Sequence, residues 1–362
     1  MASDQLGPEQ RAISLNAIDG NHVDLIVIGG GITGVGCALD AASRGLTVAL
    51  FEQRDLASGT SSRSSKLIHG GVRYLEQLNF RLVLEALRER NLLTKELAPH
   101  LVKSVSFLYP LKHRFWERIY VGLGIGLYDL FAAGTRNSLP HHRHVGPKAV
   151  KRLSPDIKMV KGCGAIIYSD ALTDDSRYTI SVARTAAGYG SHILTSTQVV
   201  DFLKDGKKVV GVQAVCTETG RQIEVRSSCV INATGVWTDD VEQLARDKTA
   251  EIRQKKVRSS KGVHIVVPRD RIKSSTGLVS RTEKSVLFII PWSDHWIIGT
   301  TDTDWALDRA HPAATSNDIS YLLQRVNKLL ENQLDTSDIQ GVYVGLRPLL
   351  TGESEDTAKL SR

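Results

Sequence analysis

The segment from Val23 to Glu52 constrains the fold more than any other part of this chain. The short apolar run Val23–Ile28 is typical of a buried strand, and three consecutive glycines break it. Apolar residues at helical spacing follow in Ile32–Ser43, and a second apolar run, Thr47–Phe51, ends at Glu52. The pattern predicts a strand–helix–strand unit of the Rossmann type.

Three glycines at the first turn of this unit follow the order Gly29-x-Gly31-x-x-Gly34. The first permits a tight turn, the second lets the backbone approach a pyrophosphate, and the third allows close helix–strand packing. The amino terminus of the helix presents free N–H groups and a positive dipole to the phosphates. Glu52 can accept hydrogen bonds from both ribose hydroxyls and disfavours a 2′-phosphate. The fingerprint therefore predicts FAD or NAD and argues against NADP.

Later segments favour FAD over NAD. Short apolar runs at His192–Ser196, Val199–Phe202, Val209–Cys216 and Gln222–Val225 alternate with turn residues and predict a β-meander. An apolar strand then ends in Asn232-Ala233-Thr234-Gly235. This ending and the meander resemble the segment that passes near the flavin diphosphate in FAD proteins of the glutathione-reductase type.

The segment after the strand–helix–strand unit carries the most specific resemblance. By composition Ser58–Ser65 is a linker or an active-site loop. The longer run reads Ala-Ser-Gly-Thr-Ser-Ser-Arg-Ser-Ser-Lys-Leu-Ile-His-Gly-Gly-Val-Arg-Tyr-Leu-Glu over residues 57–76. It resembles the signature of the FAD-dependent, quinone-linked sn-glycerol-3-phosphate dehydrogenases of the D-amino-acid-oxidase-like superfamily. Further matches extend the resemblance over roughly residues 20–360; they are Phe80–Arg90, Ile231–Trp237, Lys261–Pro268, Ile289–Trp292, Ile298–Asp302 and Gly345–Leu349.

This resemblance implies a reaction and a set of partners. The C2 hydroxyl of sn-glycerol 3-phosphate would be oxidised to give dihydroxyacetone phosphate, with hydride passing to the flavin of FAD and electrons to a membrane quinone. It implies a cytoplasmic protein held peripherally at the inner face of the cell membrane, and it is compatible with a homodimer. A nucleic-acid partner is not expected. An amino-acid oxidase would share the fingerprint but not the Arg73-Tyr74 pair.

The resemblance also assigns substrate residues. Arg73 matches the arginine that binds the substrate phosphate, and Arg347 matches a second substrate arginine, in agreement with the bidentate fit of guanidinium to phosphate. His69 and Tyr74 match residues that line the same pocket. A proton acceptor for the hydroxyl is required, and histidine suits that role near neutral pH. His69 is the first candidate for the base and His264 the second.

Residues on five stretches of the sequence are expected to hold the cofactor. The serines after the first unit could instead be solvated. No metal site is expected, because the His141–His144 stretch lacks a carboxylate or cysteine partner at a spacing suited to metal binding. The expected FAD contacts are Gly29, Gly31, Thr33, Gly34, Glu52, Gln53, Ser61, Ser62, Ser64, Ser65, Val199, Ala233, Gly235 and Trp237.

The predicted fold class is α/β, with a Rossmann-like FAD-binding domain interleaved with an α+β substrate domain on a mostly antiparallel sheet. Residues 1–21 are expected to form a polar arm. Residues 22–98, 165–250 and 340–362 would form the FAD-binding domain, and residues 99–164 and 251–339 the substrate domain. Family members continue with a Gly-Gly-Lys-x-Thr-Thr-Tyr-Arg segment and a helical domain, so we expect a truncated chain. A catalytically silent fragment that binds only a dinucleotide or a partner, and an oxygen-using oxidase, are the alternatives.

The net charge and one apolar stretch indicate which partners and surfaces the protein could contact. The formal net charge is +7, which favours anionic partners without choosing among them. The stretch Ile119–Ala133 is too short to span a bilayer and contains Asp129. Basic residues flank it, so it predicts either a helix at a membrane surface or a helix packed inside the protein.

Overall fold

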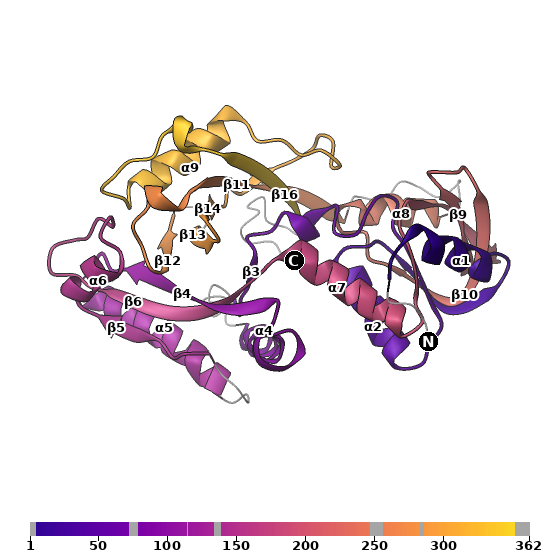
Figure 1. The fold of residues 1–362 in the computed structure, drawn as a ribbon, viewed down its shortest axis with the longest axis horizontal. Helices are drawn as coiled ribbons and strands as arrows, with labels where there is room; N and C mark the ends of the chain where they lie inside the picture. The colour runs from indigo at the N-terminus through magenta and orange to yellow at the C-terminus, as the bar shows by residue number, and fades with distance from the viewer. Residues whose placement is uncertain are drawn as a thin grey trace.

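The computed structural model describes residues 5–71, 79–113, 115–133, 139–246, 256–282 and 286–351. Figure 1 shows two lobes, each built on its own sheet, with strands β3 (Leu67–Ile68) and β16 (Gly341–Leu350) lying near their junction. The lobes are joined by several crossings of the chain, so neither lobe is one continuous stretch of sequence.

The first lobe contains the predicted strand–helix–strand unit. Its six-stranded sheet has the order β7-β2-β1-β10-β9-β8. Strands β7, β2, β1 and β10 run parallel, whereas β9 and β8 continue the sheet antiparallel. The two separate apolar runs that end at Val225 and Gly235 form one strand, β10, up to Asn232. The strand bounds are β1 His22–Ile28, β2 Val48–Phe51, β7 His192–Leu194, β8 Thr197–Asp205, β9 Lys208–Cys216 and β10 Gln222–Asn232.

Helices cover both faces of this sheet. On one face α2 (Ile32–Ser43) and α7 (Asp175–Gly188) share a core with β1 and β2. On the other face lies α1 (Pro8–Ile18), a helix where the sequence predicted a polar arm. That prediction was wrong for these residues because Leu15 and Ile18 are buried against the sheet. Two apolar residues in a polar segment suffice to dock one helical face.

The second lobe is built on a ten-stranded, mostly antiparallel sheet, as predicted. Its main path is β15-β11-β14-β13-β12-β4-β6-β3, with β16 paired to β11 and β5 paired to β6. Among the described pairings of this sheet only β12 with β4 is parallel. The other bounds are β4 Val102–Pro110, β5 Arg143–Val145, β6 Ala165–Thr173, β11 Val257–Pro268, β12 Gly277–Arg281, β13 Val286–Trp292, β14 His295–Gly299 and β15 Thr303–Asp304.

The described residues form five further α-helices. Helix α9 (Ser316–Asn327) buries Leu322 and Val326 against the second sheet, and the Asn79 side chain caps α4 (Phe80–Leu92). The remaining three are α5 (Trp116–Ala133), α6 (Pro147–Leu153) and α8 (Thr238–Leu244). No helix in the described ranges is long and apolar enough to cross a membrane.

The domain boundaries expected from the sequence differ from the sheets in three places. Strands β3, β6 and β16 pair within the second sheet, although residues 22–98, 165–250 and 340–362 were assigned to the FAD-binding domain. An apolar run identifies a strand but not the sheet that it joins, because the partner strand is distant in sequence. Strand β16 pairs with β11 from Gly341 to Leu350, along its whole length.

Helix α5 has one buried apolar side, as the packed-helix alternative predicts, and one exposed apolar side. Ile125 and Tyr128 are buried in the second lobe. The opposite side of the same helix is open, and Figure 1 shows α5 on the outside of that lobe. Large apolar side chains that are more than half exposed recur there at helical spacing, namely Trp116, Ile119, Tyr120, Leu123 and Leu130.

Candidate cofactor and substrate site

The three fingerprint glycines form a cradle that side chains would fill. A Cβ built on Gly29, whose φ is +113°, would lie 2.5 Å from the carbonyl oxygen of Ala233. A Cβ on Gly34 would lie 1.9 Å from the carbonyl oxygen of Gly29, and one on Gly31 would lie 3.2 Å from Ser61 Oγ. The backbone of the turn therefore lies in direct contact with the start of α2 and with the end of β10, and there is no room for side chains between them.

Glu52 is fixed beside this cradle at the carboxyl end of β2. Its Oε2 accepts a hydrogen bond of 2.8 Å from the Gly30 amide, and its Oε1 accepts one of 2.8 Å from the Arg54 amide. The carboxylate is therefore oriented by backbone donors on both sides. Thr33 is exposed at the first turn of α2, and Gln53 is exposed next to Glu52.

The loop that follows the first unit is folded against both lobes. Ser61 Oγ accepts a hydrogen bond of 2.9 Å from the Ile32 amide at the start of α2, while Thr60 Oγ1 donates one of 2.6 Å to the Leu346 carbonyl of β16. Ser62 Oγ lies 3.4 Å from the Gly59 carbonyl. The segment is thus anchored to both lobes and is not a free linker, and its place in an active site stays a prediction.

Two serines predicted to contact the flavin are bonded to protein groups in this structure. Ser64 Oγ donates to Asp175 Oδ2 at 2.7 Å, and Ser65 Oγ lies 2.9 Å from His264 Nε2. Lys66 forms a close ion pair with the same Asp175 carboxylate. These serines therefore connect α7 and β11 to the loop, and their contact with flavin stays a prediction.

The segment after β10 meets the fingerprint turn as expected. The Ala233 amide donates to the Ile28 carbonyl at 2.9 Å, and Gly235 has a φ of +59°, which favours glycine. Trp237 packs near Gly59, since a Cβ built there would lie 3.5 Å from the indole ring. Val199 is buried in the core of the first lobe, and strand β8 reaches Glu52 through the Thr197 amide, 2.8 Å from the Glu52 carbonyl.

Arg54 is a candidate that sequence reasoning missed. Its guanidinium lies 5.3 Å from the centre of the Trp237 ring, and its Nε is buried without a hydrogen-bond partner among the described residues. A buried donor without a partner is costly, so this group suits a ligand that carries acceptor atoms. In the sequence, only its position two residues after Glu52 on the same loop could have indicated a role in cofactor binding. Together with the glycine cradle and Glu52, this donor fits FAD.

Arg347 belongs to β16 and faces the loop Thr300–Asp302. Its Nη2 donates to Thr300 Oγ1 at 2.8 Å, its Nη1 donates to the Thr301 carbonyl at 3.1 Å, and Asp302 Oδ1 lies 3.7 Å away. The side chain keeps 19% of its surface exposed. Two hydrogen bonds to uncharged oxygens and the ion pair with Asp302 hold the guanidinium in place beside this loop.

The two candidate bases occupy different environments. His69 is exposed on the loop after β3. His264 is buried, bonded to Ser65 and stacked on Tyr343 at 4.7 Å between ring centres. Burial, aided by the positive charges of Arg347 and Lys66, lowers the pKa of His264 to about 3. A neutral ring with so low a pKa is a poor proton acceptor, and His69 therefore stays the first candidate for the base.

Arg73 and Tyr74 lie outside the described residues. Gly29, Gly31, Gly34, Glu52 and Ser61 lie around the turn after β1, whereas Ser64, Ser65 and Val199 contact protein groups elsewhere. Arg347 lies on the strand that the same loop contacts through Thr60.

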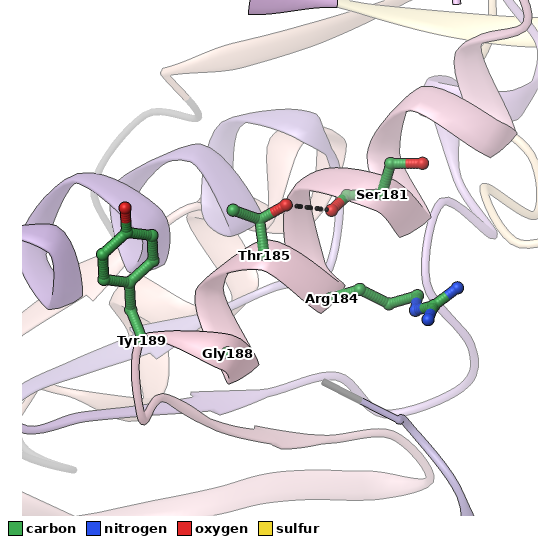
Figure 2. Close-up of a pocket in the computed structure, with 5 residues that line it drawn as sticks. All are labelled: Ser181, Arg184, Thr185, Gly188 and Tyr189. Atoms are coloured by element: carbon green, nitrogen blue, oxygen red, sulfur yellow. Dashed lines mark hydrogen bonds between the residues drawn. The ribbon is translucent and has the colours of Figure 1, made fainter. Parts of the chain in front are cut away.

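A surface depression elsewhere in the first lobe has no part in this arrangement. It has a volume of about 420 Å³ and lies on α7, far along the helix from Asp175. Figure 2 shows that its lining comes from that helix and its end, with Arg184 and Tyr189 projecting in different directions and the Thr185 hydroxyl donating to the Ser181 carbonyl. None of the candidate site residues lines it.

The cradle, the oriented carboxylate and the glycine-ended β10 are what a Rossmann fold uses to hold a diphosphate and a ribose. Together with the second sheet, these features define a two-lobed fold built to bind a dinucleotide cofactor. The chain belongs to the DAO family of FAD dependent oxidoreductases, whose family model matches residues 24–358.

Individual relatives are similar over nearly the whole chain. "Glycerol-3-phosphate dehydrogenase 2" of Mycobacterium tuberculosis (strain ATCC 25618 / H37Rv) is 57% identical over 357 residues, which are 99% of this chain and 60% of the relative. The human mitochondrial glycerol-3-phosphate dehydrogenase is 39% identical over 374 residues, covering 98% of this chain and 50% of the human protein. The chain therefore spans 50–60% of the length of these relatives.

A solved structure agrees with the fold. The glycerol-3-phosphate dehydrogenase from Bacillus halodurans, complexed with FAD, superimposes with a TM-score of 0.76 at 31% identity. The match covers 98% of this chain and 62% of that one.

Proposed function

We propose that this chain carries the FAD-binding and substrate-binding core of an enzyme that oxidises sn-glycerol 3-phosphate to dihydroxyacetone phosphate. The observation that supports this most is the loop Ser58–Ile68, which joins the cofactor turn to β16 through Ser61 and Thr60. The substrate arginine Arg347 and the base candidate His69 thereby belong to segments anchored at the cofactor edge. The 57% identity with the mycobacterial dehydrogenase supports the substrate.

The proposed reaction divides between the cofactor and the protein. Bound FAD supplies the acceptor for the hydride that leaves C2 of the substrate. Gly29, Gly31 and Gly34 admit the diphosphate by leaving backbone space, Glu52 holds the ribose, and the start of α2 offsets the phosphate charge. Arg54 would donate its Nε–H, which has no acceptor among the described residues, to an acceptor of the same cofactor.

The substrate is held and deprotonated by residues of the chain itself. The fixed guanidinium of Arg347 binds the phosphate dianion, and Arg73 is proposed to add a second guanidinium. His69 accepts the proton of the C2 hydroxyl as the carbon loses its hydride, so that the alcohol becomes a ketone with both hydrogens accounted for. Tyr74 would line the pocket.

The electron acceptor is proposed to be a membrane quinone. To test this, the FAD-loaded protein is turned over with sn-glycerol 3-phosphate and either a soluble quinone analogue or air, and dihydroxyacetone phosphate is quantified. Product that depends on the quinone supports the proposal. Product that depends on air, with equal hydrogen peroxide, assigns an oxidase instead. FAD-loaded protein that yields no product with either acceptor argues against the activity.

We also propose that α5 attaches the protein to the inner face of the cell membrane. Trp116, Leu123 and Leu130 lie one above another at seven-residue spacing, and their exposed fractions are 76%, 71% and 66%. Such an apolar stripe, with Lys112 exposed near its start, suits the boundary between headgroups and acyl chains of anionic lipid.

Vesicle sedimentation tests this attachment with a matched pair of variants. Leu123→Asp should reduce binding to vesicles of anionic phospholipid by about tenfold, because it puts a charge in the apolar stripe. Leu307→Asp changes a leucine of equal exposure, 72%, in the loop after β15 and should bind like the unaltered protein. Equal binding of all three proteins would exclude α5 as the attachment site.

A further inference from the structure

A buried hydrogen bond fixes the backbone next to His69. The Gly70 amide donates to the hydroxyl of Tyr128 at 2.8 Å, and both residues are buried. Tyr128 lies on α5, 58 residues further along the chain. The loop after β3 is thus held by a helix that contributes none of the cofactor or substrate residues described above.

The tyrosine hydroxyl is itself held on three sides. It donates to Asp170 Oδ1 of β6 at 2.6 Å, and it accepts from Arg90 Nη1 of α4 at 3.2 Å as well as from Gly70. Arg90 and Asp170 form a buried ion pair at 2.7 Å, with side chains 2% and 5% exposed. Burial, reinforced by the negative charge of Asp170, raises the pKa of Tyr128 well above its usual value.

The hydroxyl therefore keeps its proton and its direction. Its one hydrogen goes to the carboxylate, and its oxygen is left to accept from Gly70 and Arg90. In a dry interior a network with all members satisfied is rigid, whereas an amide deprived of its acceptor there is costly. The position of the Gly70 amide is consequently set by α4, α5 and β6 together.

Steric contacts restrain the same residue. A Cβ built on Gly70 would lie 2.5 Å from Leu87 Cδ2 and 2.7 Å from Tyr128 Cε2. Only glycine fits between the two helices, and Gly71, which follows, has a φ of +67°. His69 is exposed directly before this clamped pair of glycines.

We propose that Tyr128 is a positioning residue for His69: the Arg90–Asp170–Tyr128 network clamps the Gly70 amide and so aims the imidazole at the reacting hydroxyl. The role of His69 rests on the proposed function, whereas the clamp itself does not. Tyr128 touches neither the substrate nor the reacting atoms and acts only through the backbone of the loop. Its loss should therefore impair proton removal more than phosphate binding, which depends on Arg347.

The variant Tyr128→Phe tests the clamp without altering the packing of the ring. Hydrogen–deuterium exchange of a peptide covering Ser65 to Gly71 should be faster by about tenfold, the loss expected for one buried hydrogen bond. Flavin reduction at saturating sn-glycerol 3-phosphate should slow by about tenfold or more, since small displacements of a catalytic group are costly. The KM should change by less than about threefold, and FAD content should not change.

Asn91→Ala is the matched control. Asn91 Oδ1 accepts from Nε and Nη2 of Arg90 at 3.3 and 3.1 Å, so its loss weakens the same buried network without removing the acceptor of Gly70. It should lower the melting temperature while leaving flavin reduction within about twofold of the unaltered protein.

Three results would overturn the proposal. They are unchanged exchange in the Tyr128→Phe protein, unchanged flavin reduction in it, and an equal kinetic defect in the Asn91→Ala protein. If the unaltered protein does not reduce its flavin with this substrate, the proposed function fails, and the exchange measurement still decides whether Tyr128 holds the loop.

Discussion

The variant Gly34→Ala tests the cofactor cradle, because one close contact should turn a substitution that usually stabilises a helix into a destabilising one. Within a helix, glycine to alanine normally stabilises by about 0.5–1 kcal/mol, because alanine loses less backbone entropy on folding. At Gly34 in α2, the added Cβ would lie 1.9 Å from the Gly29 carbonyl oxygen and 3.4 Å from Val27 Cγ1. Neither the strand end nor the turn can rotate away as a flexible side chain would.

The expected loss of stability follows from how far α2 must move away from the turn after β1 to admit the new Cβ. Real Cβ atoms essentially never approach a heavy atom below 3.0 Å, so α2 and the turn must separate by about 1.1 Å, the difference between 1.9 and 3.0 Å. Shifts of this size in a packed interior cost about 1–3 kcal/mol. They would also move the free amides of α2 away from the diphosphate. We expect Gly34→Ala to be destabilised and to bind FAD at least about tenfold more weakly.

Gly36→Ala is the control on the same helix. A Cβ there meets nothing within 4 Å, so this variant should gain about 0.5–1 kcal/mol and keep its affinity for FAD. Urea unfolding gives the two stabilities, and quenching of flavin fluorescence gives the two affinities. Equal stability and equal FAD affinity of the two variants would refute the close approach of helix and turn.

Three further outcomes follow from single contacts. The pKa of His264 falls from 6.5 to about 3 on folding, so protonation of the unfolded chain should reduce stability as the pH drops from about 6.5 toward 3. The slope should reach about 1.4 kcal/mol per pH unit. His264→Asn should remove this contribution, and parallel curves of stability against pH for the two proteins would contradict it. Arg347→Ala should raise the KM for sn-glycerol 3-phosphate by about tenfold or more with FAD retained, whereas an unchanged KM would exclude phosphate binding. Lys261→Met removes the cation 2.6 Å from the buried Asp318 carboxylate and should lower the free energy of unfolding in urea by about 3–5 kcal/mol. A decrease below about 1 kcal/mol would show that the hydrogen bonds at the N-cap of α9 are enough to stabilise the carboxylate.

Local patterns predicted the first unit well because its signals lie within thirty residues. Strand β1, helix α2 and strand β2 begin and end within one residue of the predicted bounds, and the glycine spacing predicted the backbone cradle. The resemblance carried by Ser58–Glu76 selected the family, which the match over residues 24–358 confirms.

Long-range pairing could not be predicted in the same way. Nothing in Gly341–Leu350 indicates that the strand pairs with β11, and the apolar run of β6 does not indicate which sheet it joins. The clamp on Gly70 depends on Tyr128 and Asp170, which are 58 and 100 residues away, so only the fold brings them together. Arg54 was missed because an arginine after a strand is usually a surface charge.

One measurement bears most directly on the proposed reaction: anaerobic mixing of the FAD-loaded chain with sn-glycerol 3-phosphate while the visible absorption of the flavin is followed. We expect loss of the oxidised flavin band with one dihydroxyacetone phosphate formed per FAD, and no loss with glycerol, which lacks the phosphate for Arg347. Stoichiometric FAD that stays oxidised in the presence of sn-glycerol 3-phosphate would contradict it.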